Sequence, residues 1–158
     1  MLNIKHLQKI FPHPGKVVWI GLRPGRDAPL IEPEQALAVV GKGLQGDRFK
    51  GNSTSKRQVT LIQAEHLAVV AALLGRNAIH PSLLRRNIVV SGINLLALKD
   101  KTFSVGEAQL EMTGLCHPCS KMETVLGPGG YNALRGHGGI TAKVVQTGLL
   151  AIGDKVFL

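Results

Sequence analysis

Cysteine and aromatic residues are both scarce in this sequence, and each shortage argues against a class of protein. Two cysteines among 158 residues are too few for the disulfide framework of a small secreted protein. Aromatic side chains make up 4% of the chain, which leaves few rings on which nucleic-acid bases could stack. The longest uncharged apolar run, residues 67–74, is far shorter than the roughly 20 residues of a membrane span. Residues 1–16 do not resemble a secretory signal. We therefore expect a cytoplasmic protein with no membrane partner.

Acidic residues are the other shortage. Lysine and arginine number 19 against 10 aspartates and glutamates, a formal net charge of +9. Nucleic acid is one partner for such a chain, because neutralised phosphates release counterions. The basic residues are spread along the chain, however, and aromatic residues are few. A small phosphorylated ligand in a basic pocket fits equally well, and a solvated basic surface is the third interpretation. We do not expect a nucleic-acid partner.

The length suits one domain, and the apolar pattern is mainly that of strands. Residues 107–113 alternate most clearly, with Ala108, Leu110 and Met112 on one face. Residues 57–62 alternate as well, which puts Val59 and Leu61 on the buried side. The full set of expected strands is 16–22, 36–40, 57–62, 87–90, 107–113, 140–146 and 155–158.

Helices are fewer in the predicted structure. The Ala- and Leu-rich residues 64–75 predict one helix, with Gly75 as its C-terminal stop. Shorter helices are expected at 82–86, 119–125 and 131–135. Many short strands with few helices between them predict a mainly β fold, a β-barrel with a few short helices inserted.

Both cysteines lie in the segment Cys116-His117-Pro118-Cys119. Three chemistries could use them: a redox dithiol, half of a zinc site, or one thiolate for a softer metal. Thioredoxin-type motifs lie near the N-terminus after a first β-α unit, unlike this one. A structural zinc site needs four ligands, and no second close pair is present. Cys116 can also be a small buried hydrophobic residue.

Two basic stretches suggest a phosphate-binding pocket beside the thiol. Residues 43–48 form a glycine-rich turn that ends in Asp47 and Arg48, and residues 84–95 place Arg85 and Asn87 at the start of a strand. Arginine can bind phosphate through two parallel hydrogen bonds, and an asparagine amide can both donate and accept. Together with one soft ligand, these stretches suggest a metal cofactor that carries a phosphate.

The ordered set of motifs resembles the MOSC domain, the C-terminal domain of molybdenum cofactor sulfurases. The motifs are GLQGDR (43–48), RQVTLI (57–62), RRNIVVSGINL (85–95), VGEAQLE (105–111), CHPCSKME (116–123), GGI (138–140) and GDKV (153–156). The match covers about residues 41–158. It implies one stand-alone, bacterial-type MOSC domain over 1–158, in which residues 1–40 supply N-terminal strands of the same barrel.

The resemblance implies a cofactor and several site residues. MOSC domains bind the molybdenum cofactor, Mo-molybdopterin, and the hallmark cysteine of the family corresponds to Cys119, which would be both the molybdenum ligand and the catalytic residue. An Arg-x-Asn of the amidoxime-reducing members corresponds to Arg85 and Asn87. Those members have a small hydroxyl residue where this chain has His117. Further cofactor-binding candidates, chosen because they are near these motifs in the sequence, are Arg48, Arg57, Lys121 and Arg135.

Two functions remain open at this stage, with a third of lower rank. The first is an oxidoreductase that reduces small N-hydroxylated substrates, as stand-alone bacterial MOSC proteins do with hydroxylaminopurine, with electrons from a partner reductase. The second is a carrier of sulfur, as a Cys119 persulfide, or of the cofactor, which implies a sulfur donor or acceptor protein. The third is a basic nucleic-acid-binding module, which would bind arbitrary DNA with a steep salt dependence.

Overall fold

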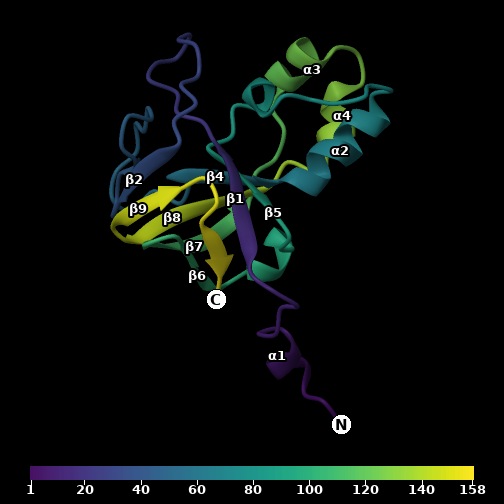
Figure 1. Ribbon diagram of the computed structural model, residues 1–158. Coiled ribbons are helices and arrows are strands. Elements are labelled where there is room, and N and C mark those ends of the chain that lie inside the picture. Colours follow the sequence, from purple (N-terminus) through teal and green to yellow (C-terminus); the bar gives the residue numbers. More distant parts are fainter.

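A closed barrel of seven strands forms the centre of the molecule, as the computed structural model of residues 1–158 shows (Figure 1). Around the barrel the strands follow the order β1-β10-β6-β7-β8-β4-β5, and a smaller sheet has the order β3-β2-β9. Every barrel pairing is antiparallel except that of β4 with β5. The mainly β barrel fold expected from the sequence is confirmed.

The strand bounds are β1 (Gly15–Ile20), β2 (Gln35–Val39), β3 (Gly43–Leu44), β4 (Val59–Gln63), β5 (Ile88–Ser91), β6 (Thr102–Val105), β7 (Ala108–Leu115), β8 (Ile140–Gln146), β9 (Gly148–Ala151) and β10 (Lys155–Phe157). The α-helices are α1 (Ile4–Leu7), α2 (Ala64–Leu73), α3 (Ser120–Leu126) and α4 (Gly130–Leu134). Two 3₁₀ helices are η1 (Pro81–Leu84) and η2 (Leu95–Leu98). None of the helices has the length and apolar character that a membrane crossing needs.

Two apolar cores hold these elements together. The larger core consists of 23 buried residues and includes Phe103 and Leu110 inside the barrel. The smaller core of 11 residues includes Ile62 of β4 and Val89 of β5, together with residues of α2, α3 and α4 such as Val70. The helices therefore cover the outer face of β4 and β5, so these two strands are buried on both faces.

The sequence pattern misleads at two polar positions, one just before β4 and one within it. Residues 57–62 predict a strand with one polar, solvent-facing side, yet Gln58 and Thr60 are buried. Both are hydrogen-bonded: Gln58 accepts from the backbone of Val144, and Thr60 bonds to Asn87. In β7, which has no helix outside it, the predicted alternation is present, with Ala108, Leu110 and Met112 buried.

The element bounds otherwise follow the sequence closely. The structure adds the short strands β3, β6 and β9, which no sequence signal had indicated. The predicted helix 64–75 is α2, and Gly75 just beyond its end has a φ of 69°, the left-handed conformation in which glycine is favoured. The segment 82–86 forms only the short 3₁₀ helix η1. β1 is a barrel strand but β2 belongs to the three-stranded sheet, which differs from the expectation that both belong to the barrel.

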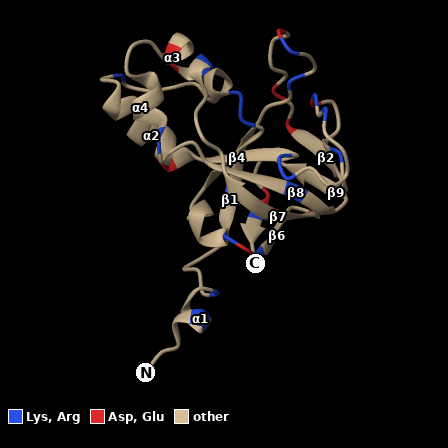
Figure 2. Ribbon diagram, turned by 180° about the vertical axis from the view of Figure 1, so that it is seen from behind, with Lys and Arg blue, Asp and Glu red and all other residues tan.

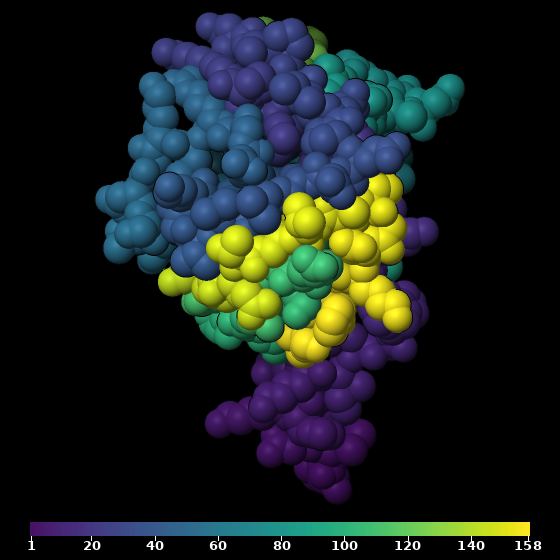
Figure 3. All heavy atoms as spheres, turned by 60° about the vertical axis from the view of Figure 1, so that its left-hand side comes forward, coloured from purple at the N-terminus to yellow at the C-terminus, as the bar shows by residue number.

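The two ends of the barrel differ in what they carry. The loop after β1, the loop after β3 and helix α3 gather at one end, and both chain termini lie toward the other (Figure 1). Residues 1–14 project from the body of the molecule (Figure 3), and α1 contains no buried residue. Figure 2 shows acidic and basic positions in the loops at the first end.

The covering helices contain a titratable contact that makes the stability of the fold depend on pH. The rings of His66 in α2 and His137 after α4 meet edge to face, with centroids 5.3 Å apart. Partial burial lowers the pKa of His66, the charge of His137 lowers it further, and Glu65 raises it. The fold therefore favours neutral His66, and the unfolded chain binds more protons as the pH falls below about 6.5.

We expect the free energy of unfolding to fall from pH 7.5 toward pH 5, and His66→Gln to reduce that fall. Urea denaturation at several pH values measures it, with His6→Gln in the exposed helix α1 as the control. Parallel pH profiles for the parent protein and His66→Gln would contradict the assignment.

Candidate functional site

Three successive residues at the start of β5 connect the barrel to the functional end of the molecule. Arg85, Arg86 and Asn87 follow η1, and its C-cap residue Arg85 has a φ of 54°. This left-handed conformation is uncommon for a residue with a side chain. It turns the chain sharply between η1 and β5, and the three side chains then have three different surroundings.

Asn87 is 1% exposed and joins three strands. Its side-chain oxygen accepts the backbone N–H of Thr60 at 3.0 Å and the Thr60 hydroxyl at 3.2 Å. Its amide nitrogen donates to the carbonyl oxygen of Gly21 at 3.1 Å. Gly21 follows β1 and Thr60 is in β4, so this side chain holds β1, β4 and β5 together. One amide N–H remains for another partner.

Arg86 is also buried, and it supports the loop that carries the cysteines. Its Nε donates to the carbonyl oxygen of Gly138 at 2.9 Å and Nη1 donates to that of Leu84 at 2.8 Å. Nη2 is buried without a hydrogen-bond partner. Burial lowers the pKa of Arg86, Cys116 raises it, Arg57 lowers it, and smaller contributions come from Cys119, which raises it, and Arg23, which lowers it. The guanidinium group thus lies among both cysteines and two other cations.

The cysteine loop rests on a pair of glycines. Cys116 is buried, and its backbone N–H donates to the carbonyl oxygen of Gly139 at 2.8 Å. A Cβ atom at Gly138 would collide with the carbonyl oxygen of Cys116, and one at Gly139 would collide with that of Leu61. Only glycines allow this approach, so the loop is held directly against β4.

Cys119 differs from Cys116 in every respect that matters for chemistry. It is exposed, and it precedes α3 as the N-cap residue without a side-chain capping bond. Its sulfur is therefore free to bind an external group. No group of three or more His, Cys, Asp or Glu side chains lies together as a metal site would require, so the two cysteines have no second ligand pair beside them.

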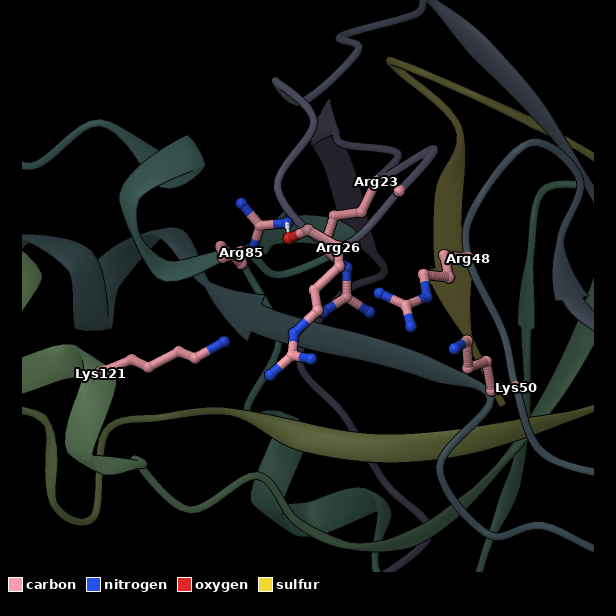
Figure 4. Close-up of a pocket in the computed structure, with 7 residues that line it drawn as sticks. Arg23, Arg26, Arg48, Lys50, Arg85 and Lys121 are labelled. Atoms are coloured by element: carbon pink, nitrogen blue, oxygen red, sulfur yellow. Dashed lines mark hydrogen bonds between the residues drawn. The ribbon is translucent and has the colours of Figure 1, made fainter.

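A cavity of about 300 Å³ lies beside α3 and is lined almost entirely by cations (Figure 4). We call it the cationic cavity. Lys121 reaches toward it from the first turn of α3, two residues after Cys119. Its lining residues are Arg23, Gly25, Arg26, Arg48, Lys50, Arg85 and Lys121, with no acidic and no apolar side chain. Such a cavity suits a highly charged anion.

An adjoining cavity of about 490 Å³ shares Arg23, Arg48 and Lys50 with the cationic cavity. It adds Lys56 and Arg57 to the cations. Unlike the cationic cavity, it is also lined by uncharged polar side chains. The remaining lining residues are Asp47, Phe49, Gly51, Ser55, Gln58, Thr60 and Asn87. The two cavities therefore form one continuous basic region.

The single acidic residue of this region has a structural function. The side chain of Asp47 is 2% exposed, and Oδ1 accepts the backbone N–H of Arg23 at 2.7 Å. The Arg23 Nε atom lies 3.6 Å from the same oxygen. In return the backbone N–H of Arg48 donates to the carbonyl oxygen of Arg23 at 2.6 Å. These contacts tie the loop after β1 to the loop after β3.

Two of the predicted site residues lie elsewhere. His117 and Arg135 line a third cavity of about 410 Å³ beside the cysteine loop, together with Tyr131. Arg135 is exposed and its Nη1 contacts the side chain of Asn132 at 3.4 Å. Arg135 therefore does not share a cavity with the other predicted cations, because the loop before Gly138 carries it to the far side of the cysteines.

The structure brings five of the other predicted residues together and adds some that the sequence analysis did not select, whereas Cys119 lines neither of these cavities. Arg48, Arg85 and Lys121 meet in the cationic cavity, and Arg57 and Asn87 line the adjoining one. The additional cations are Arg23, Arg26 and Lys50. Arg23 and Arg26 lie in the segment LRPGRD (22–27), whose Pro-Gly turn with flanking arginines was the available signal.

Comparison with known proteins identifies the family of this chain. The sequence model of the MOSC domain matches residues 44–157. The chain belongs to the MOSC family. No curated protein sequence matches it significantly.

Solved structures show the same MOSC fold. YuaD from Bacillus subtilis is 20% identical, with a TM-score of 0.77 over 91% of this chain and 94% of that one. YiiM from Geobacillus stearothermophilus is 18% identical, with a TM-score of 0.69 over 92% and 75% of the two chains. YiiM from Escherichia coli is 17% identical, also with a TM-score of 0.69, over 93% and 70%. At these identities the similarity extends to the fold.

The position of Asn87 generates a stability prediction for this MOSC domain. Asn87→Ala leaves the Thr60 backbone N–H and the Gly21 carbonyl without their side-chain partner, and each buried unpaired group costs about 1–3 kcal/mol. The Thr60 hydroxyl loses one bond but still accepts the backbone N–H of residue 87. We expect urea denaturation to show a loss of at least about 2 kcal/mol. The control is Asn132→Ala at the surface, where a change within about 0.5 kcal/mol is expected. An unchanged free energy of unfolding for Asn87→Ala would refute the structural role of the Asn87 side chain as a link between β1, β4 and β5.

Proposed function

We propose that this chain binds the molybdenum cofactor, with the Cys119 thiolate as a ligand of the molybdenum, and reduces small N-hydroxylated compounds. The observation that carries the proposal is the exposed sulfur of Cys119 two residues before Lys121, which lines a cavity together with five other cations. The chain belongs to the MOSC family, and the resemblance to that family implies the molybdenum cofactor, so this membership supports the proposal.

The residues present fit such a group. A thiolate is a soft ligand of the kind that a soft metal centre selects, and the sulfur of Cys119 has no competing hydrogen bond as a helix cap. The cofactor carries a phosphate, and arginine side chains match phosphate oxygens bidentately. Arg57 and Arg48 in the adjoining cavity would hold that phosphate. The remaining amide N–H of Asn87 would donate to a heteroatom of the pterin.

The protein residues would position the reactants. Reduction of an N-hydroxylated compound breaks the N–O bond, takes up two electrons and two protons, and gives the amine and one water molecule. When bound, the molybdenum centre supplies this two-electron chemistry. The chain has two cysteines and no motif for a flavin or an iron–sulfur cluster, so the electrons must come from a partner reductase. Arg86 would hold the cysteine loop in place from below through Gly138.

The decisive experiment is the comparison of two cysteine variants after expression in a host that makes the cofactor. We expect Cys119→Ser to lose bound molybdenum and reductase activity while keeping the fold, because serine is of similar size but is not a soft ligand. The matched control, Cys116→Ala, removes a buried thiol and should retain molybdenum. Elemental analysis, circular dichroism and reduction of an N-hydroxylated base with an artificial electron donor measure these properties.

Three other results would contradict the proposal. Equal loss of molybdenum from both variants would return the pair to a dithiol or zinc function. Unfolding of Cys119→Ser would make Cys119 a structural residue. An extra sulfur atom on Cys119 by mass spectrometry, in protein that contains no molybdenum, would favour the sulfur-carrier function.

A further inference from the structure

The basic residues of this chain are concentrated to a degree that the cofactor alone does not explain. The two cavities together are lined by eight cations and one acidic residue, and the cations are Arg23, Arg26, Arg48, Lys50, Lys56, Arg57, Arg85 and Lys121. The rest of the chain then has 11 basic and nine acidic residues. Seven of the nine net positive charges therefore surround one continuous space.

One phosphate group is too small a ligand for this space. A phosphate monoester carries about 1.5 to 2 negative charges at neutral pH. The cationic cavity alone has six cations and no acidic side chain. Like charges that face one another without counterions destabilise a fold, so a set of this size indicates a ligand with several phosphates.

The carbonyl oxygen of Arg26 links two of these cations. It accepts a hydrogen bond from Nη2 of Arg85 at 3.4 Å (Figure 4). Arg85 has the left-handed backbone conformation described above, which has an energetic cost for a residue with a side chain. Arg26 itself is exposed and points toward the cavity with no acidic partner. The geometry holds the cations close together in the absence of a compensating carboxylate.

We infer that the substrate is a nucleotide: the cationic cavity binds the polyphosphate of an N-hydroxylated nucleoside triphosphate, while the adjoining cavity binds the phosphate of the cofactor. The identity of the base as N-hydroxylated rests on the proposed function, whereas the polyphosphate rests on the cavity. A triphosphate carries about four negative charges, one on each inner phosphate and up to two on the outer one. Together with the charge of the cofactor phosphate, this roughly balances the net positive charge that remains when Asp47 is subtracted from the eight cations.

The cavity volumes agree with two small ligands. They are about 300 Å³ and 490 Å³, within the range of about 300–1,000 Å³ for small-molecule sites. A nucleic-acid strand is the competing polyanion. Single strands bind along grooves with aromatic side chains under successive bases, and the only aromatic residue that lines either cavity is Phe49. The concave shape and this lining favour the free nucleotide.

The first test is a binding measurement that does not depend on molybdenum. Isothermal titration of the purified protein compares N6-hydroxyadenosine triphosphate with its nucleoside. We expect the triphosphate to bind at least a hundredfold more tightly, and ATP, the product of the proposed reduction, to bind within tenfold of it. Arg26→Gln should weaken triphosphate binding ten- to a hundredfold and leave nucleoside binding unchanged. The control Lys155→Gln removes the same charge from β10, outside both cavities, and should change affinity less than twofold.

Two results of this measurement would overturn the inference. Equal affinities for the triphosphate and the nucleoside would show that the polyphosphate is not recognised. A single-stranded DNA oligomer and ATP can be compared as competitors at equal concentrations of phosphate groups. If the oligomer displaces the triphosphate more effectively than ATP does, the region is a nucleic-acid site.

The second test separates this inference from the proposed function. For protein loaded with molybdenum, kcat/KM should be at least tenfold higher for the triphosphate than for the free N-hydroxylated base, and Arg26→Gln should remove that preference. Equal kcat/KM values would leave the reductase function intact and refute the nucleotide substrate. If the purified protein contains no molybdenum and reduces neither compound, the reductase function is refuted. The polyphosphate site remains supported in that case if the same protein binds the triphosphate and Arg26→Gln weakens that binding.

Discussion

The hydrogen bonds of the Asn87 side chain are the constraint from which the rest of the site follows. β5 pairs in parallel with β4 and antiparallel with β1, so the start of β5 is where three strands must be brought into register. A single buried amide does this by bonding to Thr60 on one side and Gly21 on the other. Because this junction fixes the position of residue 87, it also fixes where the two arginines before it must go.

The two arginines use that fixed position differently. Arg86 turns inward and hydrogen-bonds to Gly138, which supports the cysteine loop from below, whereas Arg85 lines the cationic cavity. Lys121, in the first turn of α3 and two residues after Cys119, lines the same cavity. Strand pairing, loop support and ligand charge are thus combined in three consecutive residues, and a change at one of them affects more than one property. Hydrogen bonds of buried polar groups can specify structure in this way.

The sequence predicted the elements well where local patterns are strong and less well where burial depends on distant parts of the chain. β7 alternates because solvent covers one of its faces. Residues 57–62 alternate in the same way, but Gln58 and Thr60 are buried and hydrogen-bonded, Gln58 to Ser55 and Thr60 to Asn87. The order of motifs identified the family and the exposed cysteine. It did not indicate that Arg23 and Arg26 join the site, because the loop after β1 is brought there by Asp47, a contact between residues 24 positions apart. It also grouped Arg135 with the other cations, because proximity in sequence does not show on which side of the cysteine loop a residue lies.

The uneven distribution of charge has a consequence for how the molecule meets its ligands in solution. Most of the excess positive charge lies at the end of the barrel that carries the β1 and β3 loops, and the termini lie toward the other end (Figure 1). Anions that approach are attracted toward this end and are turned with their most negative group foremost. Encounter is accordingly fast at low ionic strength and slows as added salt shortens the Debye length, to about 8 Å at physiological concentrations. A partner protein that docks at this end to deliver electrons would need an acidic face, and it would compete with the anions that this charge attracts.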